Sequence, residues 1–306
     1  MPLHISTPLL ESRALSLAAG RSVWLKLESM QPPGSFKIRG IGLACEEYKR
    51  RGARRFISSS GGNAGIAVAY AGRCLSVPVT VVVPETASQR ARALIRQEGA
   101  ELVVHGASWQ EANALAQSML QPTDAFLHPF DDPLLWRGHA SLIDEVAAAG
   151  LKPEAVVLAV GGGGLLCGVV EGMRRNGWAD VPVVAAETEG AASFHQSVQA
   201  GYRVELKEIT SIASSLGAKQ VCEQAYAISA SHPVRSVVVS DKAAVAACHR
   251  FLDDQHVLVE PACGAALALA YELPAALNDF KSVLFVVCGG VTASLTQLQQ
   301  WAGRLA

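Results

Sequence analysis

Short apolar runs alternate with longer amphipathic stretches along most of the chain. The apolar runs are rich in valine and bounded by turn residues, which is typical of buried strands. Helical patterns follow them, the first at 36–50 and the next from residue 63. Apolar strands separated by helices predict an α/β fold whose mostly parallel sheets are covered by helices on both faces. The predicted strands span 22–27, 54–60, 77–84, 100–106, 154–164, 181–190, 234–240 and 282–290.

Composition narrows the class of protein. The chain has 306 residues, 50% hydrophobic and 17% charged, and this length favours two domains. A net charge of -1 gives no reason to expect a nucleic acid or an anionic membrane as a partner. The longest apolar runs are far shorter than the roughly 20 residues of a membrane-spanning helix. The composition therefore fits a well-packed soluble enzyme.

The cysteines and the N-terminus indicate a compartment. The seven cysteines are odd in number, form no Cys-x-x-Cys pair and lie partly inside apolar runs. Such a pattern favours reduced thiols and a cytoplasmic location. The first twenty residues lack the charged start and long apolar core of a secretion signal.

One lysine stands where a reactive amine would be useful. Lys37 follows a Gly-Ser turn in "GSFKIRG" (34–40) and lies at the head of the helical pattern at 36–50. A surface helix can carry a lysine anywhere, so an ordinary solvated side chain is the alternative. A lysine held by small residues at a helix start is suited to covalent catalysis.

Two glycine-rich stretches follow predicted strands. "SSSGGNAG" (58–65) exposes backbone N–H groups at a helix start, which suits a carboxylate or a phosphate. Asn63 is there either as a helix cap or as a ligand contact, and Ser60 either as a turn residue or as a proton donor. "VGGGGLLCG" (160–168) matches neither a Walker loop nor a dinucleotide fingerprint. Four consecutive glycines favour a phosphate cradle over simple helix packing.

Two further residues lie at strand ends. Cys288, in "VVCGG" (286–290), is either a buried small hydrophobe or a contact to a ligand. Glu187 follows a strictly apolar strand, so its carboxylate needs an arginine, backbone donors or a cation as partner. We interpret His128 and His139 as structural, since the histidines show no metal-ligand spacing. Asp131 and Asp132 are expected to cap the turn or helix beside them.

A reactive lysine combined with a phosphate site suggests pyridoxal 5'-phosphate as cofactor. The lysine would hold the aldehyde of the cofactor, and the glycine cradle would hold its phosphate. No G-x-S-x-G elbow or HExxH motif offers a competing chemistry.

These motifs resemble those of the L-serine dehydratase/L-threonine deaminase family, within the fold-type II pyridoxal-phosphate enzymes. The resemblance implies a tryptophan synthase β-like fold of two open, twisted, mostly parallel sheets. It makes Lys37 the Schiff-base residue, with Phe36 against the pyridine ring. It makes Ser60, Gly61, Gly62, Asn63 and Ala64 the substrate-carboxylate loop, with Asn63 also at the phenolic oxygen of the cofactor. It makes Gly161, Gly162, Gly163, Gly164 and Leu165 the phosphate loop, and Cys288 the partner of the pyridine nitrogen.

The same resemblance implies a monovalent cation such as K⁺, held by Glu187 with backbone carbonyls near Ala191 and Leu216. "HAS" (139–141), "VCGG" and "VEPACGAAL" resemble the animal-type serine dehydratases. Gly61 departs from the alanine or serine of many members and resembles a serine dehydratase-like branch with weaker turnover. The resemblance also implies a homodimer.

The expected activity is conversion of L-serine to pyruvate and ammonia, and of L-threonine to 2-oxobutyrate and ammonia. Serine racemisation, β-replacement on the same fold, and a weakly active pyridoxal-phosphate-binding regulatory homologue are the alternatives. The expected division is a large cofactor-binding domain of residues 1–34 and 135–306 and a small substrate-loop domain of residues 35–134.

Overall fold

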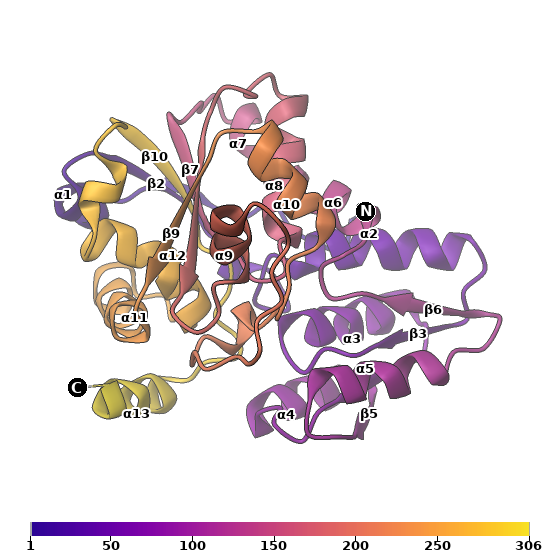
Figure 1. The fold of residues 1–306 in the computed structure, drawn as a ribbon. Helices are drawn as coiled ribbons and strands as arrows, with labels where there is room; N and C mark the ends of the chain where they lie inside the picture. Colours follow the sequence, from indigo (N-terminus) through magenta and orange to yellow (C-terminus); the bar gives the residue numbers. More distant parts are fainter. Residues whose placement is uncertain (1, 306) are drawn as a thin grey trace.

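The computed structural model describes residues 2–305 and contains two separate β-sheets (Figure 1). The larger sheet has six strands in the order β1-β2-β10-β7-β8-β9. Strand β1 pairs antiparallel with β2, and the remaining neighbours pair in parallel. The strands are β1 (Leu9–Glu11), β2 (Ser22–Lys26), β7 (Ala155–Ala159), β8 (Val183–Thr188), β9 (Val234–Val239) and β10 (Ser282–Val286).

The smaller sheet has four parallel strands in the order β5-β4-β3-β6. These strands are β3 (Arg55–Ser58), β4 (Val79–Val83), β5 (Glu101–Val104) and β6 (Asp124–Leu127). The helices that alternate with them are α2 (Lys37–Arg50), α3 (Asn63–Leu75), α4 (Gln89–Gln97) and α5 (Trp109–Ser118). All of these elements lie together in the indigo-to-magenta part of Figure 1.

The other helices accompany the larger sheet or connect the two sheets. The α-helices are α1 (Arg13–Ala19), α6 (Pro133–His139), α7 (Ser141–Ala148), α8 (Gly164–Arg175), α9 (Ser193–Ala200), α10 (Glu223–Ser231), α11 (Asp241–Gln255), α12 (Pro261–Tyr271) and α13 (Leu295–Leu305). Residues 2–305 also contain three short 3₁₀ turns, η1 (Glu28–Met30), η2 (Ser214–Leu216) and η3 (Pro274–Leu277).

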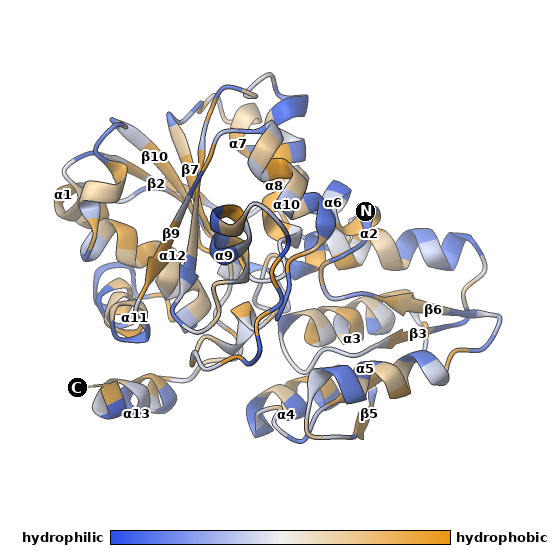
Figure 2. Cartoon of the chain, in the orientation of Figure 1, coloured by the Kyte–Doolittle hydropathy of each residue, from blue (hydrophilic) through white to orange (hydrophobic). Residues whose placement is uncertain are grey.

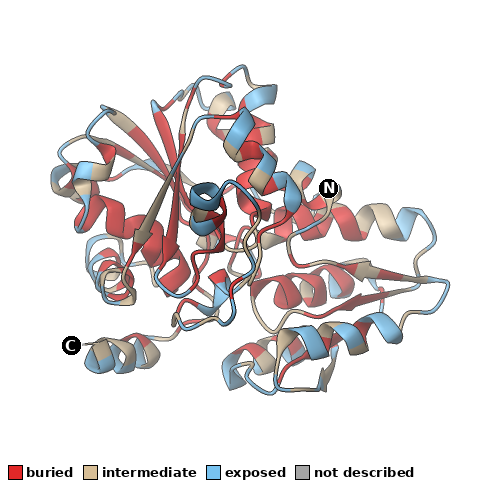
Figure 3. Cartoon of the chain, in the orientation of Figure 1, coloured by how far each residue is buried: buried red, intermediate tan, exposed pale blue. Residues whose placement is uncertain are grey.

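The central strands and α12 form the middle of the larger core. Every residue of β7 and of α12 is buried, which explains why both segments are apolar along their whole length (Figures 2 and 3). A second hydrophobic core lies between the smaller sheet and helices α2 and α3. Each sheet therefore has an apolar core of its own.

The parallel arrangement brings the candidate loops together. Strands β7 and β10 are neighbours, so the glycines after β7 and Cys288 after β10 emerge at the same edge of the larger sheet. In the smaller sheet, β3 lies between β4 and β6, and the loops after these three strands also emerge side by side. Ligands of open α/β sheets bind beyond such carboxyl ends.

The α/β architecture and each predicted strand are confirmed, with ends that differ by a few residues. Strand β6 was not predicted, because it is only four residues long, begins with an aspartate and lies at the edge of its sheet. The predicted domain boundaries after residues 34 and 134 stay a prediction. Each helix within residues 2–305 is too short or too polar to cross a membrane.

Candidate functional site

A cavity of about 960 Å³ lies where the loops of the two sheets meet. It brings together nearly all of the sequence-predicted site residues, although these come from five separate parts of the chain. Glu187 and Ala191 are not among the residues that line it. The predicted residues that do line it are Phe36, Lys37, Ser60, Gly61, Gly62, Asn63, Ala64, Gly161, Gly162, Gly163, Gly164, Leu165, Leu216 and Cys288.

The amine of Lys37 reaches into this cavity from the first residue of α2. Its Nζ donates a hydrogen bond to the carbonyl oxygen of Pro129 at 2.5 Å and lies 5.1 Å from the centre of the Phe36 ring. Burial lowers the pKa of Lys37 to about 8, because a charged ammonium loses solvation in the cavity. A lysine with this pKa has a substantial neutral fraction near physiological pH, and the neutral amine is the nucleophile.

The residues after Lys37 fix the position of α2. A side chain at Gly40 would lie 2.5 Å from both the His139 ring and the Leu135 carbonyl oxygen of α6, so glycine allows the two helices to touch. The Gly40 amide donates to Nδ1 of His139 at 3.2 Å, in agreement with a structural role for that histidine. The fully buried Arg39 guanidinium is held by Glu28 and Glu145, each at 2.7 Å. The start of α2 is therefore anchored by packing and by charge.

The turn after β6 connects the lysine to the glycine cradle. Nδ1 of His128 accepts a hydrogen bond from the amide of Asp131 at 2.7 Å, so this histidine is also structural. Asp132 caps α6 through the amide of Leu134, as expected. This turn presents the Pro129 carbonyl oxygen to Lys37 and the ring of Phe130 to the cradle.

The glycines at 161–164 are packed from behind by other residues. A Cβ on Gly162 would lie 2.3 Å from the Phe130 ring, and one on Gly163 would lie 2.3 Å from Cβ of Ala225. Gly163 also has a backbone φ of +94°, which residues other than glycine rarely adopt. It is the N-cap residue of α8. The first N–H groups of a helix lack intrahelical partners, so the cradle presents backbone donors to an anion.

The loop before α3 forms the opposite wall. The structure corrects the capping alternative for Asn63: Gly62 is the N-cap residue, no side chain caps this helix, and Nδ2 of Asn63 instead donates to Oε1 of Glu260 at 2.7 Å. Oγ of Ser60 accepts a hydrogen bond from the amide of Gly62 at 3.3 Å. The Ser60 hydroxyl hydrogen remains free to be donated to a ligand.

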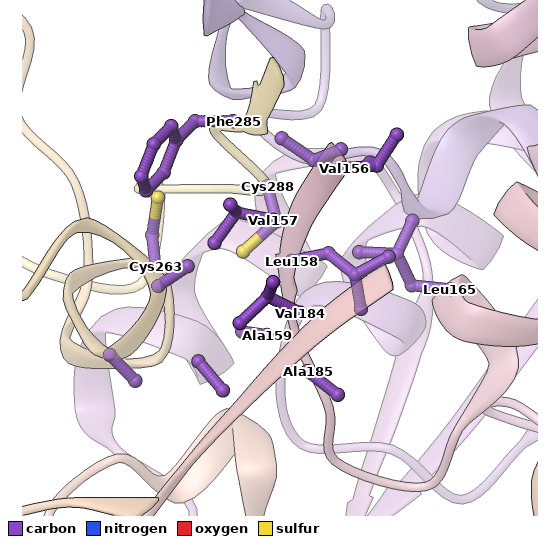
Figure 4. Packing of buried hydrophobic residues seen from close by; sticks show 14 of the residues in the cluster. Val156, Val157, Leu158, Ala159, Leu165, Val184, Ala185, Cys263, Phe285 and Cys288 are labelled. Atoms are coloured by element: carbon purple, nitrogen blue, oxygen red, sulfur yellow. The ribbon is translucent and has the colours of Figure 1, made fainter. Parts of the chain in front are cut away.

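Cys288 is both buried and in contact with the cavity. Figure 4 shows its side chain among those of Val157, Leu158 and Ala159. The neighbouring thiol of Cys263, together with burial, raises the pKa of Cys288 well above its ordinary value. The thiol is therefore neutral at physiological pH. Within residues 2–305 the structure pairs none of the seven cysteines in a disulfide.

Glu187 lies at the end of β8 and has backbone donors as partners. Its carboxylate accepts from the amides of Phe194 at 2.9 Å and His195 at 2.7 Å, at the start of α9. Burial nevertheless raises the pKa of Glu187 to about 8. Among residues 2–305 no cluster of three or more His, Cys, Asp or Glu side chains is arranged to hold a metal ion. A cation here would depend on this one carboxylate and on carbonyl oxygens.

Sequence reasoning missed the cavity residue Glu260. It directly precedes Pro261 in the otherwise apolar "VLVEPACGAAL" (257–267). The argument applied to Glu187, that a carboxylate in an apolar stretch needs a partner, would have drawn attention to it. The long connection from α9 to α10, which lines the cavity at 211–220, carries no comparable signal in the sequence.

Comparisons with known proteins agree with this geometry. Residues 1–289 match the family model described as "Pyridoxal-phosphate dependent enzyme". The chain is 49% identical to L-serine dehydratase/L-threonine deaminase of Homo sapiens, over 97% of this chain and 94% of that protein. It is 50% identical to serine dehydratase-like of Mus musculus, over 98% and 94%. The crystal structure of L-serine ammonia-lyase from Rhizomucor miehei superposes with a TM-score of 0.95 at 35% identity, covering 100% of both chains. The chain belongs to the family of pyridoxal-phosphate-dependent enzymes.

Proposed function

We propose that this protein is a pyridoxal-phosphate-dependent lyase that converts L-serine to pyruvate and ammonia, and L-threonine to 2-oxobutyrate and ammonia. The observation that carries the proposal is the half-buried Lys37 side chain, whose amine has a pKa of about 8, in one cavity with a glycine cradle and a neutral thiol. The relatives named for serine dehydratase and serine ammonia-lyase activity support it, since they cover almost the whole chain.

The residues of the cavity fit this cofactor. The cradle offers backbone N–H groups for a phosphate. The side-chain oxygen of Asn63 is buried and has no hydrogen-bond partner in the protein, so it is available to a polar group of the cofactor. We infer that Gly161–Leu165 hold the phosphate, Lys37 the aldehyde carbon, and Cys288 the ring nitrogen. When bound, the cofactor supplies an electron sink for negative charge that develops on the α-carbon of the substrate.

The chain itself positions the substrate and moves protons. Backbone N–H groups of 60–64 would bind the substrate carboxylate and so orient the bond from the α-carbon to its hydrogen. The free Lys37 amine takes that proton, because its lowered pKa leaves it neutral often enough to act as a base. Ser60 would give a proton to the departing β-hydroxyl group, and the alternative source would be the phosphate that the cradle holds. The balanced outcome is one pyruvate and one ammonia for each serine consumed.

Cys288 favours elimination over the competing reactions. A thiol whose pKa is raised cannot keep the ring nitrogen protonated, whereas an aspartate would. A neutral ring is a weaker electron sink, so prompt loss of the β-hydroxyl group competes well with racemisation and transamination.

The test is a product assay with purified, cofactor-loaded protein. L-Serine should yield pyruvate and ammonia in equal amounts, and L-threonine should yield 2-oxobutyrate. An excess of D-serine over pyruvate would indicate racemisation instead of lyase activity. Formation of cysteine when sulfide is added would indicate β-replacement. Cofactor binding without turnover of either amino acid would instead identify a regulatory homologue.

The proposal also includes a homodimer, a cytoplasmic location and a K⁺ ion at Glu187 with carbonyl oxygens near Ala191 and Leu216. Sedimentation and cell fractionation test the first two. Replacing K⁺ by Li⁺ should lower activity or thermal stability if Glu187 holds a cation, since the buried carboxylate would lose its counter-charge. An unchanged response would leave Glu187 with its two backbone partners alone.

A further inference from the structure

The carboxyl group of Glu260 lines the cavity and does not cap the helix that begins beside it. Glu260 is the N-cap of α12, where a carboxylate often accepts hydrogen bonds from the first helical amides. Its side chain makes no capping hydrogen bond, and the residue is only 3% exposed. A buried carboxylate that accepts no hydrogen bond from its own helix needs hydrogen-bond donors elsewhere in the protein.

Two side chains donate to this carboxylate, and they come from different parts of the molecule. Nδ2 of Asn63, at the start of α3, donates to Oε1 at 2.7 Å. Oγ1 of Thr292, in the loop after β10, donates to Oε2. The Ser215 side chain, in the connection between α9 and α10, lies near the carboxyl group and lowers its pKa, although burial has the larger, opposite effect. The carboxylate therefore joins the wall of the smaller sheet to the loop after β10 beside the larger sheet.

The contact with Asn63 fixes the orientation of an amide that faces the cavity. A carboxylate only accepts hydrogen bonds, so the NH₂ end of the Asn63 side chain must point to Glu260. The other end, Oδ1, is buried and has no partner, and Asn63 as a whole is 7% exposed. One Nδ2 hydrogen and the Oδ1 atom thus remain for a polar group in the cavity.

We propose that Glu260 is a positioning residue that holds the Asn63 amide, and with it the start of α3, in the orientation that binds the cofactor. This inference rests on the proposed cofactor site. Without the carboxylate, the Asn63 side chain would lose its buried acceptor and could rotate, and its contact with the cofactor would be lost together with the link between the two walls.

A double-mutant cycle tests whether Glu260 acts through Asn63. The proteins are the wild type, Asn63→Ala, Glu260→Leu and the double variant. Two quantities are measured without substrate: the dissociation constant of pyridoxal phosphate and the absorption maximum of the bound cofactor. Each single variant should weaken binding about tenfold, the loss expected for one hydrogen bond. The double variant should match the single ones within about twofold, and all three should shift the absorption maximum alike.

Two controls separate positioning from general damage. Glu260→Gln keeps an acceptor for Asn63 and a polar partner for Thr292, so it should restore most of the affinity and the wild-type absorption maximum. Glu272→Leu removes an exposed carboxylate at the opposite end of α12 and should behave like the wild type. Should Glu260→Leu not fold, Thr292→Val provides the second test, because it removes one support of the same carboxylate. It should weaken binding in the wild type and have no effect in Asn63→Ala.

The inference is overturned if the losses add to about a hundredfold in the double variant, if Glu260→Leu leaves both quantities unchanged, or if Glu260→Gln is as impaired as Glu260→Leu. These results are distinguishable from failure of the proposed function. A wild-type protein that binds the cofactor and converts serine, but gives an additive cycle, overturns only the role of Glu260. A wild-type protein that does not bind the cofactor at Lys37 overturns the proposed site itself.

Discussion

The two walls of the cavity use the same local pattern, a strand followed by a glycine-rich loop and a helix, for different purposes. On the large-sheet wall, the glycines at 161–164 are surrounded closely by Phe130, Ala225 and the backbone near Leu216. On the small-sheet wall, a Cβ on Gly62 would meet no atom within 4 Å. Packing thus requires glycine in the cradle, whereas the other loop is closely packed at Gly61, where a Cβ would lie 2.8 Å from Cβ of Ala87, and leaves open space at Gly62.

The two walls also differ in the polar groups that they present to the cavity. The small-sheet wall carries the side chains with reactive or hydrogen-bonding groups, Lys37, Ser60 and Asn63. The large-sheet wall offers the backbone donors of the cradle, the neutral thiol of Cys288 and the Glu260 carboxyl group, which accepts from Asn63. A rigid backbone cradle opposite a wall of polar side chains suits a cofactor that is held by its phosphate and reacts at its other end.

Of the glycine substitutions in the two walls, the replacement of Gly162 should have the largest effect on the affinity for pyridoxal phosphate. In Gly162→Ala the new Cβ would lie 2.3 Å from the Phe130 ring, so the ring or the cradle must move. Overpacking of this kind costs roughly 1–3 kcal/mol, which corresponds to about a fivefold to 150-fold weaker binding of pyridoxal phosphate if the cradle absorbs the strain. Absorbance titration measures the dissociation constant. Unchanged affinity would show that the cradle does not need its close packing.

The titration of Lys37 tests the polar wall. Because burial lowers the pKa of Lys37 to about 8, its amine should become neutral, and so reactive, as the pH rises through 8. Labelling of the cofactor-free protein with an amine-specific reagent, followed by peptide mass spectrometry, measures this midpoint. Exposed Lys207 is the reference in the same digest. A midpoint for Lys37 near its ordinary value of 10.5 would contradict the burial of this amine.

The smallest effect is expected for Gly62→Ala. Its φ of -137° is negative and a Cβ would meet open space, so only its ψ of -148°, which lies beyond the usual extended region, opposes a side chain. We expect the free energy of unfolding to change by less than about 0.5 kcal/mol and the cofactor affinity by less than about twofold. Chemical denaturation and the same titration measure both. A loss as large as that of Gly162→Ala would remove the distinction between the two walls.

The parts of the site that could be predicted from sequence are those with local signals. The cradle is a run of glycines after a buried strand, and Lys37 stands in a short turn at a helix start, so a few neighbouring residues suffice to identify each. Glu260 was missed because its partners Asn63 and Thr292 lie 197 and 32 positions away in the chain. The capping alternative for Asn63 was wrong because the helix already begins at Asn63 and Gly62 is its N-cap, a boundary that the local sequence does not fix.

The central claim is that Lys37 binds pyridoxal phosphate covalently. The direct measurement is to load the protein with the cofactor, reduce it with borohydride and locate the label by peptide mass spectrometry. We predict one phosphopyridoxyl group on Lys37, and loss of both the label and pyruvate release in Lys37→Ala. A label on a different lysine, or pyruvate release that persists in Lys37→Ala, would contradict the account.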